Sequence, residues 1–132
     1  MYYRIPQMVA MGKIAADGKV LRATPGIKVK PEIIPGNGPD VGYTVSLPKG
    51  LMVDDDYIIQ LTAENFGEDG PDYTITTIAY RYQRKNSFEV IIWGDRGQTL
   101  PLSGHAAIVS VQCSWSFVLY DMSPLGTLIP LK

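Results

Sequence analysis

Apolar and polar residues alternate with a period of two through most of this chain, and this constrains the fold more than any other feature. The longest such stretch is 106–121, in which every second residue from Val109 to Leu119 is apolar. Successive side chains of a β-strand point to opposite faces of the sheet, so the pattern predicts half-buried strands. No spacing of three and four residues continues far enough to predict a long helix. The chain is therefore expected to be all-β.

Turn residues divide the alternating segments and predict seven or eight strands. The segments are Gln7–Ala15, Val20–Ala23, Ile27–Lys30, Val41–Leu47, Asp56–Glu64, Tyr73–Gln83, Ser87–Trp93 and Ala106–Asp121. Asp17-Gly18 lies between the first two segments and is a strong hairpin signal. Prolines and glycines gather in 31–40, and 94–104 has no alternation, so both are expected to be loops.

Two half-apolar sheets must bury their faces against each other, which favours an antiparallel β-sandwich of jelly-roll or immunoglobulin-like type. The 132 residues fit one domain, expected to carry terminal arms at 1–8 and 122–132. The alternation also predicts the core. Its members are expected to be Tyr43, Val45, Leu47, Ile59, Leu61, Val109, Val111, Trp115 and Phe117.

Both arms are apolar but lack a regular pattern. The C-terminal arm reads MSPLGTLIPLK, and Pro124 and Pro130 prevent a regular helix there. An apolar, extended segment is not expected to remain in water, so it should dock on its own sandwich or on another chain. We expect an oligomer or partner contact from Tyr2, Tyr3, Ile5, Leu125, Leu128, Ile129 and Leu131.

Charge and hydropathy exclude several classes of function. The net charge is −1, so the chain has no basic field for binding nucleic acid through phosphates. No apolar run approaches the roughly 20 residues of a membrane helix. The first residues lack a charged segment followed by an apolar one, so we expect no signal peptide and synthesis in a reducing cytoplasm.

The residue types that carry catalysis or bind metals are scarce. The chain has one cysteine, Cys113, which alternates with apolar residues and is expected to be buried and inert. His105 follows Ser103-Gly104 without the oriented third group of a triad. Asp54–Asp56 lacks the spacing of a calcium loop and is expected to be a turn in which one aspartate caps backbone N–H groups. We therefore expect no enzyme activity, no cofactor and no metal.

Four aromatic residues are candidates for ligand or partner contact. Phe66 lies in the polar segment NFGEDGPD, which reads either as a small sugar site or as an ordinary connection. Tyr80, Tyr82 and Trp93 are predicted to share one outer sheet face. Such a face can bind a protein or a sugar, although cross-strand aromatic pairs also stabilise sheets without any ligand.

Several strand segments also resemble small β-sandwich domains of bacteriophage fibre proteins. Met11–Val20 resembles the family's opening pattern G-x-V-x-x-D-G-T, and the later strands resemble its G-F-x-V, Y-T-V-x-F, x-Y-x-V-x-x-T-A and F-x-V patterns. The segments that carry these later patterns are Gly26–Val29, Tyr43–Leu47, Asp56–Ala63, Ser87–Val90 and Ser116–Leu119. The resemblance covers about residues 9–120, and it depends on the order and spacing of short patterns.

The resemblance implies a virion component of a tailed phage, and proteins of this kind are usually homotrimers on tail or head fibres. It gives no catalytic residues. The chain lacks the collagen-like or coiled-coil stalk of a long fibre, which favours a fibre base, an adaptor or a capsid decoration that binds other virion proteins. The alternative is a module that binds host surface glycans, with Phe66, Tyr80, Tyr82 and Trp93 as its contacts.

Overall fold

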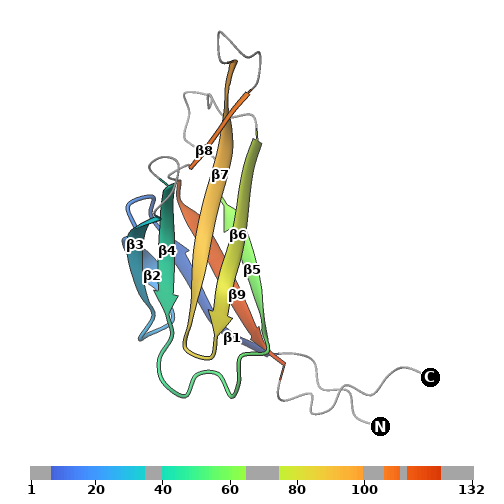
Figure 1. The fold of residues 1–132 in the computed structure, drawn as a ribbon. Coiled ribbons are helices and arrows are strands. Elements are labelled where there is room, and N and C mark those ends of the chain that lie inside the picture. The colour runs from blue at the N-terminus through green and yellow to red at the C-terminus, as the bar shows by residue number, and fades with distance from the viewer. Residues whose placement is uncertain (1–6, 35–39, 65–74, 100–105, 111–112, 123–132) are drawn as a thin grey trace, which may run out of the picture.

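The structure is a computed structural model that describes residues 7–34, 40–64, 75–99, 106–110 and 113–122. Within these residues the chain forms nine β-strands (Figure 1). They are β1 (Gln7–Ile14), β2 (Val20–Ala23), β3 (Lys28–Ile34), β4 (Asp40–Ser46), β5 (Tyr57–Ala63), β6 (Ile75–Arg84), β7 (Ser87–Thr99), β8 (Ala106–Ser110) and β9 (Trp115–Asp121). The described residues include no helix, and hence none that is long and apolar enough to span a membrane.

The strands form two antiparallel sheets that pack face to face, so the predicted β-sandwich is confirmed (Figure 1). Sheet A has the order β2-β1-β9-β5 and sheet B the order β3-β4-β7-β6. β8 pairs with the same edge of β7 as β4 does, but further along the strand. β4 pairs with residues 87–91 of β7, whereas β8 pairs with residues 93–99. The first and last strands, β1 and β9, are neighbours in sheet A, whereas the constant-type immunoglobulin order places them in different sheets.

The core lies between the two sheets and is centred on aromatic rings. The Trp115 ring is 5.3 Å from that of Tyr43 and 6.0 Å from that of Phe117, and Phe117 meets Phe88 edge to face. The predicted core is confirmed for the residues that are fully buried: Tyr43, Val45, Leu47, Ile59, Trp115 and Phe117. Leu61 is only partly buried. The side chains of Val109 and Val111 lie outside the described residues.

Two tyrosines connect the sheets at opposite ends of the sandwich. Tyr43 of sheet B donates a hydrogen bond to the Ala16 carbonyl, in the turn between β1 and β2, at 2.6 Å. Tyr57 of sheet A donates one to the Arg84 carbonyl, at the end of β6, at 2.5 Å. Burial raises the pKa of each phenol to about 12. Both groups are therefore held in the neutral form, which can donate these bonds.

The hairpin predicted at Asp17-Gly18 is confirmed. Gly18 has a φ of 91°, and its N–H donates to the Ala15 carbonyl at 2.9 Å. The predicted loop 31–40 is wrong for 31–34, which continue β3, and for Asp40, which begins β4 and pairs with Ile34. Pro31 is tolerated there because β3 is an edge strand, so the missing N–H costs no bond within the sheet. Residues 35–39 lie outside the described residues.

The predicted loop 94–104 is likewise wrong for 94–99, which extend β7. These residues have poor strand propensity, but β7 pairs there with β6 on one side and β8 on the other. The predicted single strand 106–121 is divided between the sheets: β8 belongs to sheet B and β9 to sheet A. Alternation with a period of two is the same in either sheet, so it cannot reveal where a chain crosses between them.

Candidate functional site

The residues predicted for oligomer contact in the two arms lie outside the described residues. The structure does show where the arms begin. Gln7 of β1 is the register partner of Asp121 of β9, so residues 1–6 and 123–132 are attached to neighbouring strand ends. The predicted bound of the N-terminal arm is wrong for Gln7 and Met8, which belong to β1. Both arms thus leave sheet A at the same end.

The predicted aromatic face is not assembled as expected. Tyr80 is the register partner of the buried Val90, whereas Trp93 pairs with Thr77. Because Val90 and Trp93 are three residues apart on β7, alternation puts them on opposite faces, and the prediction that Tyr80 and Trp93 share a face is wrong. Phe66 lies outside the described residues.

Tyr82 reaches the outer face of sheet B through a bulge in β6. The register shifts between Arg81 and Arg84, so Tyr82 and Gln83 together face Phe88. Tyr82 has a φ of 52°, a conformation that is rare for a bulky residue. Gln83 fixes the bulge because its Nε2 donates to the Tyr57 carbonyl at 2.6 Å and to the Asp55 carbonyl at 2.9 Å.

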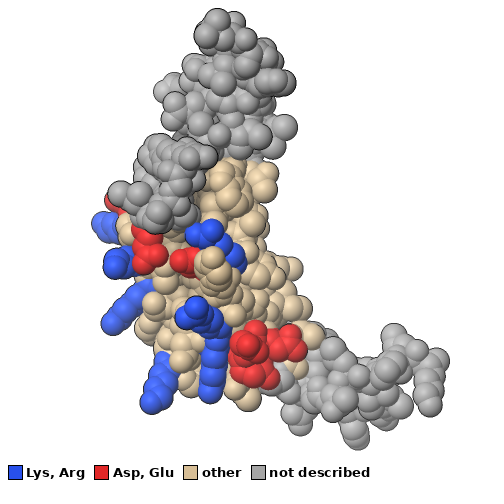
Figure 2. Space-filling model, in the orientation of Figure 1, with Lys and Arg blue, Asp and Glu red and all other residues tan. Residues whose placement is uncertain are grey.

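The outer face of sheet B is polar, and its charges contact each other. Figure 2 shows basic and acidic side chains over this face. Arg81 Nε lies 2.9 Å from Glu89 Oε2, and the Arg81 guanidinium lies over the Tyr82 ring, 5.0 Å from its centre. A shallow groove of about 360 Å³ lies beside them, and Glu32 and Thr44 also line it. Burying this face would desolvate the Arg81–Glu89 pair and the charged side chains beside it, which opposes a subunit contact here.

The outer face of sheet A carries apolar side chains in two adjacent cross-strand rows, of which the second also contains Gln60 on β5. One row joins Met8, Tyr120 and Ile58, and the next includes Met11 and Val118. Met8, Met11 and Ile58 are 52%, 46% and 43% exposed. We call these five residues the sheet A patch. Exposed large apolar side chains that adjoin one another on one face are a candidate for an interaction surface.

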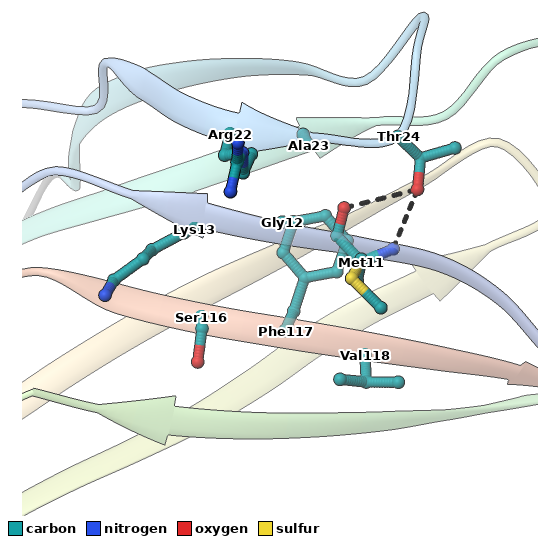
Figure 3. A pocket seen from close by; sticks show the side chains of 9 residues that line it. All are labelled: Met11, Gly12, Lys13, Arg22, Ala23, Thr24, Ser116, Phe117 and Val118. Atoms are coloured by element: carbon teal, nitrogen blue, oxygen red, sulfur yellow. Dashed lines mark hydrogen bonds between the residues drawn. The ribbon is translucent and has the colours of Figure 1, made fainter.

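A groove of about 470 Å³ lies within this face (Figure 3). Met11 and Val118 lie on one side of it, and Lys13 and Ser116 lie on the other. The Phe117 ring lies directly beneath the groove at Gly12. A Cβ on residue 12 would come within 2.4 Å of Phe117 Cε1. Glycine thus lets the Phe117 ring pack directly under the β1 backbone.

The end of β2 borders this groove. Thr24 follows β2, and its Oγ1 accepts a hydrogen bond from the Met11 N–H at 2.9 Å (Figure 3). The Thr24 N–H donates to the Met11 carbonyl, also at 2.9 Å. β2 pairs with β1 only from Gly12 to Ile14, so within the described part of the chain no strand pairs with Gln7–Ala10 on that side. Among the described strands, the edge of β1 next to the patch is therefore without a partner, and we call it the open edge of β1.

The sheet A patch was missed by the sequence predictions, although the sequence carries a signal for it. Apolar residues follow each other without a polar one between them in 8–11, 57–59 and 117–120. A strand with one solvated face alternates, whereas consecutive apolar residues put apolar side chains on both faces. The alternation identifies only the inward residues of these strands, so it leaves the patch out.

The residues considered for catalysis or metal binding have structural roles where they are described. Asp54 Oδ1 accepts a hydrogen bond from the Asp56 N–H at 2.9 Å, which confirms the predicted capped turn. Cys113 is buried as predicted, and burial raises the pKa of its thiol. His105 lies outside the described residues. Among the residues that are described, His, Cys, Asp and Glu form no group of three suited to a metal ion.

The chain was compared with protein-family models, with curated proteins and with solved structures, and none of them matches.

Proposed function

We propose that this protein is a non-enzymatic structural component that assembles with copies of itself, in the virion of a tailed phage. Within a virion its place would be a fibre base, an adaptor or a capsid decoration. The observation that carries the assembly role is the sheet A patch, next to the strand ends from which both arms leave. The virion setting rests on the sequence resemblance alone.

The energetics of the patch and the arm support assembly. Fully burying one large aliphatic side chain is worth about 1.5–3 kcal/mol. The patch offers three such side chains that are about half exposed, and the C-terminal arm offers four more. Association must offset an estimated 4–15 kcal/mol of lost translational and rotational freedom. Patch and arm together supply enough apolar surface for that, whereas either alone is marginal.

The contrast between the two outer faces indicates which of them makes the subunit contact. Sheet B pairs Arg81 with Glu89 and covers Tyr82 with the same guanidinium, so burying this face would desolvate charges. The outer face of sheet A also carries an ion pair, Lys13–Glu64, but it lies beyond the row of Met11 and Val118, and the five residues of the patch themselves bear no charge. We therefore place the subunit contact on sheet A.

Sedimentation of the full chain tests this function. We expect a mass that is a multiple of 14.5 kDa, three times that value for the trimer that the resemblance implies. Deleting residues 123–132 is expected to leave a folded sandwich and to weaken or abolish the oligomer. A full chain that remains a monomer at every accessible concentration would contradict the proposal.

Glycan binding remains the second candidate, and one observation favours it. Tyr82 is 62% exposed and keeps a strained φ beside a groove lined by Glu32, Thr44 and Arg84. Strain of this kind often persists where a side chain has a function, and aromatic rings with polar neighbours suit sugars. A glycan array with the wild type and Tyr82→Asn separates the candidates. Asparagine tolerates this φ, so binding that is lost in Tyr82→Asn would favour the glycan module.

A further inference from the structure

We propose that the outer face of sheet A receives the C-terminal segment, residues 123–132, of a second copy of this chain. This inference rests on the proposed assembly function and names the contact that would produce it. The segment would lie over Met11 and Val118 and along the open edge of β1. Each copy would thus offer both a receiving face and a donated segment.

The chemistry of the segment matches that of the face. Residues 123–131 contain Leu125, Leu128, Ile129 and Leu131 and no charged residue. The groove that would receive them is lined mainly by apolar atoms, including those of Met11 and Val118. Pro124 and Pro130 reduce the number of conformations that the free segment can adopt, which lowers the entropy lost when it docks.

The open edge of β1 provides a second means of binding. Within the described residues, β2 leaves Gln7–Ala10 without a neighbour on the side away from β9. An extended segment can add to such an edge through backbone hydrogen bonds, while its alternate side chains enter adjacent pockets. The groove next to Met11 is the adjacent pocket here. Residues 125–129 contain no proline, so they retain the N–H groups that this pairing needs.

The topology of sheet A favours a second copy over the same copy. β1 lies between β9 and the edge at Gln7–Ala10, so the segment of the same copy would have to cross the end of β1 before it could pair there. Two strand spacings are about 9.4–9.8 Å, and crossing them takes about three extended residues, which places the end of the crossing near Leu125. The remaining residues would then run parallel to β1. A second copy has no such constraint and can add its segment in the antiparallel orientation, which is the more stable pairing.

Mixing two defective variants tests the exchange directly. The first variant is the full chain with Met11→Asp, which spoils the receiving face but keeps the segment. The second lacks residues 123–132 but keeps the face. We expect each variant alone to be monomeric, with self-association about a hundredfold or more weaker than in the wild type. Their equimolar mixture should form a one-to-one complex, which native mass spectrometry resolves because the two chains differ in mass.

Two further variants keep the test decisive. Thr62→Asp puts the same charge on the outer face of sheet A, in the row beyond Met11 and Val118, and should associate like the wild type. Ile58→Asp places a charge on the same patch from β5 and should weaken self-association. It therefore still tests the patch if Met11→Asp fails to fold. Circular dichroism and thermal melts confirm that each variant is folded.

The possible failures are distinguishable. If the wild type oligomerises but the mixture gives no heterocomplex, the exchange is wrong and the assembly function stands. The same holds if the chain that lacks 123–132 keeps the wild-type oligomeric state. If the wild type is itself monomeric at all concentrations, the assembly function fails and the exchange fails with it.

Discussion

The two outer faces of this sandwich have the same backbone pattern but differ in chemistry. On sheet B, Lys30, Thr44, Glu89 and Arg81 form one cross-strand row, in which Arg81 binds Glu89. Sheet A has an ion pair of its own, Lys13–Glu64, but the two rows nearest the start of β1 hold the five residues of the patch. Sheet A thus has a cluster of exposed apolar side chains beside its charges, whereas the row of sheet B is polar throughout.

This difference shows where function can be sought in a protein whose described residues contain no group of His, Cys, Asp and Glu suited to a metal ion. The inward residues of both sheets serve the core and would be similar in any sandwich. The outward residues are free to differ, so an apolar outward row indicates a surface that the fold itself does not explain. If the two faces differ as described, the effects of substitution should decrease from the shared core to the ion pair of sheet B.

Trp115→Ala tests the core that both faces share. Trp115 is fully buried between the sheets against Tyr43 and Phe117. We expect a loss of about 3–5 kcal/mol in the free energy of unfolding. Denaturant melts measure it, and a loss below about 1 kcal/mol would mean that the two sheets do not pack as described.

Gly12→Ala tests the floor of the sheet A groove. The new methyl group would meet the Phe117 ring, so either the ring or β1 must move. We expect a loss of about 1–3 kcal/mol from overpacking. The matched control is Gly12→Ala in a Phe117→Leu background, where the shorter side chain makes room and the added cost should be smaller. An equal cost in both backgrounds would show that the ring does not cause the strain.

Alkaline titration tests the two tyrosines that connect the sheets. Each has a folded-state pKa of about 12 against an ordinary 10.0, so the folded protein holds the phenolic proton more tightly than the unfolded chain. Their contribution to stability is therefore complete below pH 10 and is lost as the pH rises towards 12. Tyr43→Phe with Tyr57→Phe should flatten this loss. An unchanged profile in the double variant would assign the loss to other groups.

The smallest effect is expected at the ion pair of sheet B. Arg81 and Glu89 are partly exposed, so their pairing should be worth about 0.2–1 kcal/mol in a double-mutant cycle. The variants Arg81→Met and Glu89→Gln supply the cycle. Neither should change the oligomeric state, because this face is expected to remain in water. A change of that state in either variant would place sheet B in the contact.

Alternation in the sequence was sufficient to predict the sandwich, most strand bounds and the buried side of β4 and β9. It failed where pairing outweighed local propensity, at Pro31–Ile34 and Gly94–Thr99. It also failed for Tyr82, because a bulge adds a residue and so changes the face on which neighbouring side chains of the strand lie. The sheet A patch was within reach of the sequence through its consecutive apolar residues, but grouping them required the register of three strands.

The most direct test of the central claim compares one aspartate on each sheet. Ile58 and Tyr82 lie on the outer faces of sheets A and B and are 43% and 62% exposed, so each substitution removes a large exposed side chain from one outer face. Aspartate also tolerates the positive φ of Tyr82. Sedimentation velocity of Ile58→Asp and Tyr82→Asp then measures the mass of each folded variant. We predict that Ile58→Asp is monomeric and that Tyr82→Asp keeps the wild-type oligomer. An Ile58→Asp variant that keeps the oligomer, or a Tyr82→Asp variant that loses it, would contradict the claim that sheet A is the assembly face.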